Sequence, residues 1–206
     1  MFCTSLECGG NITKNEVICE IIVGDGLPVP KIRTGKPSPY DYYVGGLMII
    51  FGIDPGYAII GYGVIEKIGN KYNVLDYGVV TTPAKLDLSV RLNIMYNEIE
   101  QKINEYNPDC IAIEELFFNT NITTAIAVAQ ARGVLVLCAT KANKKIYEYT
   151  PLQIKQAITG YGRAEKKQMQ KMVQTLLNLR EMPKPDDAAD ALAVALCCGN
   201  SEREIR

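Results

Sequence analysis

The chain has 206 residues, of which 48% are hydrophobic and 22% are charged, and its formal net charge is −1. These values match an ordinary globular domain and exclude a disordered or fibrous chain. No apolar run is long enough to cross a bilayer, and the amino end lacks the cationic start and apolar core of an export signal. We therefore expect a cytoplasmic protein without membrane contact.

The sequence contains no histidine and seven cysteines. The absence of histidine excludes serine–histidine and cysteine–histidine triads, histidine general bases and histidine zinc sites. The cysteines have no regular spacing, which indicates reduced thiols rather than a disulfide framework. Any hydrolytic chemistry must therefore use carboxylates, lysines, a bound metal or cysteine.

Residues 1–47 differ in character from the remainder of the chain. Glycines and prolines interrupt them, and only residues 17–23 have the apolar, β-branched pattern of a strand. From Met48 onward, strand and helix patterns alternate densely. We therefore predict a domain at 48–206, preceded by an extension, 1–47, of unknown role. The extension is sequence from upstream of a natural start at Met48 or from cloning, or alternatively a small accessory hairpin.

The first half of the predicted domain indicates an antiparallel meander followed by a helix. Three runs rich in Ile, Val and Tyr are joined by short links, which is typical of consecutive antiparallel strands: 48–54, 58–67 and 72–80. Apolar residues then recur at spacings of three and four over 87–106, which predicts an amphipathic helix that ends before Pro108.

The second half indicates two further strands and four helices. The predicted strands are 109–114 and 146–149, and the predicted helices are 123–137, a helix that begins at 151 and ends at Gly160, 164–179 and 186–198. Thr150 and Gln153 have the spacing of a capping box, with Pro151 at the first helical position. The order predicts an α/β fold with a mixed sheet and helices on its faces.

Two of the predicted buried strands each end in a carboxylate, Asp54 and Glu114. A charge at the end of an apolar strand is costly to bury unless it is paired or binds a metal. The last helix begins with Asp186 and Asp187, and Asp190 follows on the same face as Asp187. Helix capping explains Asp186, and Asp187 considered alone, but Asp190 lies too far inside the helix to cap it.

A group of these carboxylates would form an oxygen-only site with a high negative charge. Such ligands match Mg²⁺ or Mn²⁺ better than zinc. Two such ions about 4 Å apart stabilise both the attacking and the leaving oxygen of a phosphodiester, without any histidine. A basic stretch, 141–171, has eight basic and two acidic residues. It is either a phosphate-binding surface or a solvated helix face.

Several motifs follow one another in order across 48–206: 52–56 with 61–64, 112–114 with Phe117, 130–133, 153–155, 160–166 and 187–192. In order and spacing they resemble the RuvC-type Holliday junction resolvases, crossover junction endodeoxyribonucleases with a ribonuclease H-like fold. The resemblance implies a five-stranded mixed sheet flanked by helices and no organic cofactor. It also implies the family's four catalytic and metal-binding acids, which fall on Asp54, Glu114, Asp187 and Asp190.

The same resemblance implies a homodimer that nicks two opposed strands of a four-way DNA junction during recombination and repair. It implies Mg²⁺, two ions per site with Mn²⁺ able to substitute, a thymine-rich cleavage site, and cooperation with the branch-migration proteins RuvA and RuvB in the bacterial cytoplasm. By family match, Phe117 stacks on an unpaired base, and Lys155 and Lys166 contact the DNA. Phe118 either stacks on DNA or packs in the core.

The predicted helix within 122–137 is nearly apolar on all sides, so it must bury two faces. It is either the dimer interface or a helix enclosed within one subunit.

Three rival functions follow from similar patterns. An actin-like or sugar-kinase-like ATPase needs a second lobe, for which the chain is too short, and no G-x-x-x-x-G-K-[ST] loop is present. A non-catalytic junction-binding protein would be expected to lack one or more of the four acids. A related nuclease that acts on another nucleic acid, such as ribosomal RNA precursors, stays open because fold does not fix substrate.

Overall fold

The structure is a computed structural model that describes residues 18–19, 32–33, 47–116 and 122–201. The chain divides into two compact units, residues 1–46 and residues 47–206. In the first unit, β1 (Ile18–Cys19) and β2 (Ile32–Arg33) pair in antiparallel fashion. The role of residues 1–47 stays a prediction.

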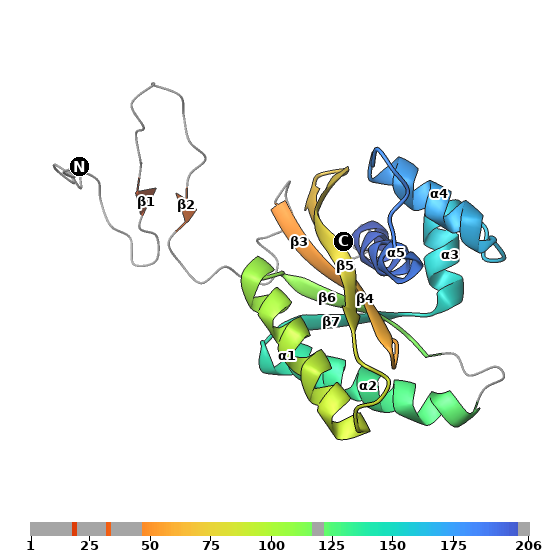
Figure 1. Cartoon of the computed structure of the whole chain (residues 1–206). Coiled ribbons are helices and arrows are strands. Elements are labelled where there is room, and N and C mark those ends of the chain that lie inside the picture. Colours follow the sequence, from red (N-terminus) through yellow and green to blue (C-terminus); the bar gives the residue numbers. More distant parts are fainter. Residues whose placement is uncertain (1–17, 20–31, 34–46, 117–121, 202–206) are drawn as a thin grey trace. The chain divides into compact units, whose positions relative to one another are not determined.

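The second unit contains a five-stranded mixed sheet in the order β5-β4-β3-β6-β7 (Figure 1). The strands β3 (Leu47–Asp54), β4 (Ile59–Ile68) and β5 (Lys71–Thr81) form the predicted antiparallel meander. Two parallel strands, β6 (Cys110–Glu114) and β7 (Lys145–Tyr149), extend the sheet from β3. The predicted mixed sheet of an α/β fold is confirmed.

Helices cover both faces of this sheet (Figure 1). One face carries α1 (Leu88–Tyr106) and α2 (Ile122–Lys141), and the other carries α3 (Pro151–Thr159), α4 (Lys166–Leu176) and α5 (Asp186–Ser201). No helix in the described part of the chain is long and apolar enough to cross a membrane.

Several helix boundaries differ from the sequence prediction by two to four residues, and two of these differences have a clear local cause. Helix α2 continues to Lys141, because residues 138–141 contain neither proline nor glycine to end it. Helix α4 ends at Leu176, where Leu177 leaves the helix and Asn178 adopts a positive φ of 49°. The predicted capping box is confirmed, because the Gln153 N–H donates to Thr150 Oγ1 at 3.2 Å and the Thr150 N–H donates to Gln153 Oε1 at 2.8 Å.

Strand alternation divides the apolar side chains between two cores. On β3, Ile50 belongs to the core beneath α3, α4 and α5, whereas Phe51 and Ile53 belong to the core beneath α1 and α2. On β6, Ala112 and Ile113 divide in the same way. Because side chains alternate along a strand, the residue after Ile53 on β3 and the residue after Ile113 on β6 both face α5.

Helix α5 lies unusually close to the sheet because its inner face meets glycines. A Cβ atom at Gly52 would lie 2.3 Å from the Ala191 carbonyl oxygen, and one at Gly61 would lie 2.0 Å from the Asp187 carbonyl oxygen. These distances are too short for any side chain, so glycine is required for the helix backbone to approach the strands this closely. The glycines therefore fix how near the start of α5 lies to β3 and β4.

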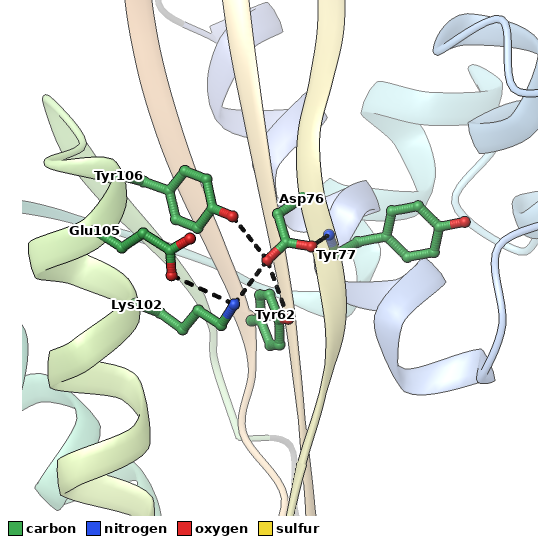
Figure 2. Close-up of polar contacts among 6 residues, drawn as sticks. All are labelled: Tyr62, Asp76, Tyr77, Lys102, Glu105 and Tyr106. Atoms are coloured by element: carbon green, nitrogen blue, oxygen red, sulfur yellow. Dashed lines mark hydrogen bonds and ion pairs between the residues drawn. The ribbon is translucent and has the colours of Figure 1, made fainter.

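A polar cluster joins α1 to the sheet on the face opposite α5 (Figure 2). Asp76 Oδ2 accepts hydrogen bonds from Lys102 Nζ at 2.9 Å, from the Tyr106 hydroxyl at 3.0 Å and from the Tyr62 hydroxyl at 3.1 Å. Asp76 Oδ1 accepts from the backbone N–H of Tyr77 at 2.9 Å. Both oxygens of this carboxylate therefore have donors from the protein itself.

Candidate active site

Two of the predicted acids lie side by side at the edge where β3 and β6 end. Asp54 is the last residue of β3 and Glu114 the last of β6, and the parallel register pairs the residues just before them, Ile53 with Ile113. Both carboxylates follow a residue that faces α1 and α2, so both are directed to the α5 face. The sheet alone therefore brings Asp54 and Glu114 together.

The other two acids come from the start of α5. In the antiparallel register Asp54 lies opposite Gly61. A side chain at Gly61 would clash with the backbone carbonyl of Asp187, so Asp187 lies directly over this position. Asp190 follows one helical turn later on the same helix face as Asp187. The glycine contact therefore places the two α5 acids above the two strand acids.

The electrostatics of the cluster agree with this arrangement. Burial, followed by the charges of Glu114, Asp190 and Asp187, raises the pKa of Asp54 to about 8. Burial and the charge of Asp190 raise the pKa of Glu114 to about 7, although a hydrogen bond with Asp54 opposes the rise. Burial also raises the pKa of Asp190. The acids repel one another in a partly buried site, and titratable groups with pKa values raised in this way are typical of functional sites.

Two lysines lie near these acids. Lys166 Nζ lies 3.4 Å from Asp190 Oδ2 and 3.2 Å from Asp186 Oδ2. The charge of Lys155 lowers the pKa of Glu114, which acts against the larger effect of burial. The sequence shows no basic residue close to Asp190, but the fold supplies Lys166 from the start of α4.

The donor set fits a hard divalent cation by its chemistry. Carboxylate oxygens are the ligands that Mg²⁺ and Mn²⁺ prefer, and a cation would relieve the repulsion that raises the pKa values of Asp54 and Glu114. Among the described residues, however, no group of three or more Asp, Glu, Cys or His side chains is placed so that it could hold a metal ion. The acids influence one another's ionisation, but their side chains do not form a preformed metal site.

Two of the predicted site residues, Phe117 and Phe118, lie outside the described residues.

Helix α2 buries Leu135 and Ala139 against the sheet, but Ile126 is 65% exposed and Leu137 is 54% exposed. The alternative of a helix enclosed within one subunit is therefore wrong for the described residues.

The close approach of α5 to the strands was not predicted from the sequence. The signal was present as glycines at 52, 61 and 63 in two adjacent strands, combined with an alanine-rich helix. Small residues on both partners allow backbone-to-backbone contact, which a strand or helix pattern considered alone does not reveal.

Comparison with known proteins identifies the family. The model of the family described as crossover junction endodeoxyribonuclease RuvC matches residues 50–198. The chain belongs to this family. The RuvC protein of Halothermothrix orenii is 60% identical over 156 residues, which is 76% of this chain and 94% of the relative.

Solved structures of RuvC agree with this membership. The Thermus thermophilus RuvC structure has 34% sequence identity and a TM-score of 0.71, and the match covers 76% of this chain and 96% of that chain. Thermus thermophilus RuvC in complex with a Holliday junction substrate has 32% identity, a TM-score of 0.70 and the same coverage. The fold is therefore the ribonuclease H-like fold of the RuvC resolvases. As a RuvC member, the protein is a Holliday junction resolving endonuclease of DNA recombination and repair, and a metal-dependent hydrolase of phosphodiester bonds.

Proposed function

We propose that Asp54, Glu114, Asp187 and Asp190 are the catalytic, metal-binding residues of this RuvC protein and that they hold two Mg²⁺ ions, for which Mn²⁺ can substitute. The observation that carries the proposal is the convergence of these four acids on one face of the sheet, with the pKa values of Asp54 and Glu114 raised to about 8 and about 7. A buried cluster of like charges is stabilised most directly by a bound cation.

The residues of the chain have distinct tasks in this proposal. When bound, the ions supply Lewis-acid stabilisation of the charge that develops on a phosphodiester. The four carboxylates must lose their protons to act as ligands. Asp54 and Glu114 are held by the ends of two paired strands, and Asp187 and Asp190 by the first turns of α5, so three elements fix the site. Residues on rigid elements keep such a site in a constant geometry.

The substrate in this proposal is a four-way DNA junction, as in the Thermus complex. Lys155 and Lys166 contact phosphates near the cleaved strand, which fits their positions beside Glu114 and Asp190. Phe117 stacks on an unpaired base, which contributes about 1–3 kcal/mol per base.

The active form in this proposal is a homodimer that nicks two opposed strands. The outer face of α2, with Ile126 and Leu137 exposed, supplies the subunit interface. The protein acts in the bacterial cytoplasm together with RuvA and RuvB. Residues 48–206 form the nuclease domain, and residues 1–47 are an extension of unknown role.

The purified protein tests this proposal in one assay. It is incubated with a labelled four-way junction or with a linear duplex of matched sequence, in Mg²⁺, in Mn²⁺ or in excess chelator. We expect symmetric paired nicks in the junction only, with Mg²⁺ or Mn²⁺ present. Cleavage in excess chelator would contradict the metal site, and equal cleavage of both DNAs would contradict junction selectivity.

The DNA contacts are tested by comparing Lys155→Ala with Phe117→Ala. Loss of a phosphate contact weakens binding and reduces its salt dependence, whatever the substrate's base pairing. Loss of base stacking is partly rescued by mismatches at the junction centre, because the cost of unstacking is then already met. Identical behaviour of the two variants would contradict the separate roles.

A further inference from the structure

Arg91 is the one charged side chain that is fully buried among the described residues, with 1% of its surface exposed. It lies on the inner face of α1, where the core residues Met95, Ile99 and Ile103 follow it at successive intervals of four residues. The helix pattern would therefore accept an apolar side chain at this position. An arginine here needs another explanation.

The guanidinium of Arg91 contacts two separate segments. Arg91 Nε donates to Thr82 Oγ1 at 2.9 Å, and Arg91 Nη2 donates to the carbonyl oxygen of Tyr57 at 3.0 Å. The guanidinium carbon also lies 3.7 Å from the centre of the Tyr57 ring. Within the described ranges Arg91 forms no ion pair with a carboxylate.

Burial of a guanidinium without a carboxylate partner is costly, and an apolar side chain of similar volume would fill the core at less cost. What an apolar residue cannot supply is a rigid, planar set of donors that reaches two acceptors and stacks on an aromatic ring at once. The contacts of Arg91 use all three of these properties.

The segment that Arg91 holds is the turn directly after Asp54. The turn is tight, since a Cβ at Gly56 would lie 1.9 Å from the Ile59 carbonyl oxygen. The Thr82 N–H donates to the Ala58 carbonyl at 3.0 Å, and Thr82 Oγ1 lies 3.4 Å from that same oxygen. Residues 55–58 are thus fastened to the end of β5 and to α1 through Thr82 and Arg91.

We infer that Arg91 is a positioning residue for Asp54. By holding the turn in place at Tyr57, Arg91 fixes the direction in which the Asp54 carboxylate projects toward α5. The inference rests on the proposed metal-binding role of Asp54. Arg91 touches neither the acids nor any other group of the cluster in its described contacts, so it acts through the backbone of residues 55–57.

The electrostatic contacts of Asp54 support an effect through geometry rather than charge. The charged groups that act on the Asp54 carboxyl are Glu114, Asp190, Asp187 and Lys166, from β6, α5 and α4. Replacement of Arg91 by another cation would therefore not restore its function, because the planar donors and the stacking are lost.

The test compares Arg91→Lys and Thr82→Val with a matched control, Ile99→Ala. Lysine keeps the charge, and valine keeps the volume of Thr82 while removing the hydroxyl that Arg91 reaches. Ile99 is fully buried on the same face of α1 but lies eight residues, about 12 Å along the helix, from Arg91, so Ile99→Ala serves as the control for destabilisation of this core. Each full-length variant is assayed at a temperature at which it is folded.

Three quantities are measured: kcat on a saturating four-way junction, KM for the junction, and the affinity for Mn²⁺ without DNA. We expect Arg91→Lys to lower kcat and Mn²⁺ affinity by about 10–100-fold, as is typical when a group that orients a metal ligand is changed, with KM little altered. Thr82→Val should act in the same direction to a smaller extent, and Ile99→Ala should lower Tm without these changes.

Wild-type Mn²⁺ affinity in Arg91→Lys, or an equal loss in Ile99→Ala, would overturn the inference. Asp54→Asn is assayed in parallel to separate the two claims. If Asp54→Asn binds Mn²⁺ as the wild type does, the proposed metal site fails. If Asp54→Asn loses Mn²⁺ and Arg91→Lys keeps it, only the positioning role of Arg91 is wrong.

Discussion

Asp54 and Asp76 belong to the same sheet and both face a helix, yet their surroundings are opposite. Asp76, on the α1 side, accepts hydrogen bonds from Lys102, Tyr106 and Tyr62 (Figure 2). Burial acts to raise the pKa of Asp76, but these donors and the charge of Lys102 lower it below its usual value. On the α5 side, burial and three neighbouring acids raise the pKa of Asp54 to about 8.

Asp76 is a structural acid, whereas Asp54 is an acid that we propose as a metal ligand. The Asp76 carboxylate has its partners within the fold, so its negative charge stabilises the native state. The Asp54 carboxylate is surrounded by like charges that oppose ionisation, and only Lys166 acts in the other direction. A protein retains such repulsion where an external cation or substrate completes the site, at a cost in its own stability.

The largest effect that we expect comes from Asp54→Asn. The substitution keeps the volume of the side chain but removes one charge, and cleavage of a four-way junction should fall by about 10³-fold. Junction affinity should persist, because phosphate contacts rather than the acids provide it. Gel-shift and nicking assays measure the two quantities. Undiminished nicking by the variant would contradict the catalytic role proposed for Asp54.

The next effect concerns pH and the demand for metal. The metal-free pKa values of about 8 for Asp54 and about 7 for Glu114 mean that protons compete with the cation as pH falls from 8 to 6. The Mg²⁺ concentration for half-maximal cleavage should therefore rise as pH falls, by up to about tenfold per pH unit for each proton displaced. A titration at pH 6, 7 and 8 measures it, and a constant requirement would contradict the raised pKa values.

Stability should depend on pH in opposite directions in the two regions. The folded pKa of Asp54 lies above its unfolded value, so the metal-free native state loses stability as pH rises from about 4 towards about 8. The folded pKa of Asp76 is lowered, so its stabilising effect is present above pH of about 4 and is lost as pH falls below it. Asp54→Asn should raise Tm in chelator at pH 8, and Asp76→Asn should lower Tm by on the order of 5 °C.

Thermal melts of the two variants and the wild type across this pH range check the opposite signs. Asp76→Asn serves as the matched control, because it is the same chemical change on the other face of the sheet. It should leave the Mg²⁺ requirement of the folded protein unchanged. A fall in Tm for both variants at pH 8 would mean that the two acids are alike.

The smallest effect should come from removal of residues 1–47, with the chain started at Met48. The first pair of the β3–β4 ladder, Leu47 and Ile68, is largely exposed, so its loss removes little buried surface. We expect Tm to change by no more than about 2 °C and cleavage to be preserved. A large loss of either quantity would show that the extension contributes to the nuclease fold or to the dimer.

Much of the fold could be predicted because local sequence patterns indicate its individual strands and helices. The alternation of strand and helix periods gave the elements, the short links gave the meander, and the Thr150–Gln153 spacing gave the start of α3. The pairing of β3 with β6 and the approach of α5 depend on contacts between distant segments. Periodicity does not encode such contacts.

The candidate site was predictable for a similar reason and to a similar limit. Acids at the ends of two buried strands and inside an alanine-rich helix are visible from residue types alone. The pairing of Lys166 with Asp190 arises only when α4 and α5 come together in the fold. Arg91 has a sequence signal, a charge on the apolar face of an amphipathic helix, but its partners at Tyr57 and Thr82 become evident only from the tertiary structure.

The most direct test of the account is a calorimetric titration of Mn²⁺ into the metal-free wild type, Asp54→Asn and Asp76→Asn at pH 8 without DNA. We expect two bound ions for the wild type and for Asp76→Asn, and at least tenfold weaker binding for Asp54→Asn, because Asp54 is a ligand of the proposed metal site and Asp76 is not. Equal Mn²⁺ affinity of Asp54→Asn and the wild type would contradict the claim that the converging acids form the metal site.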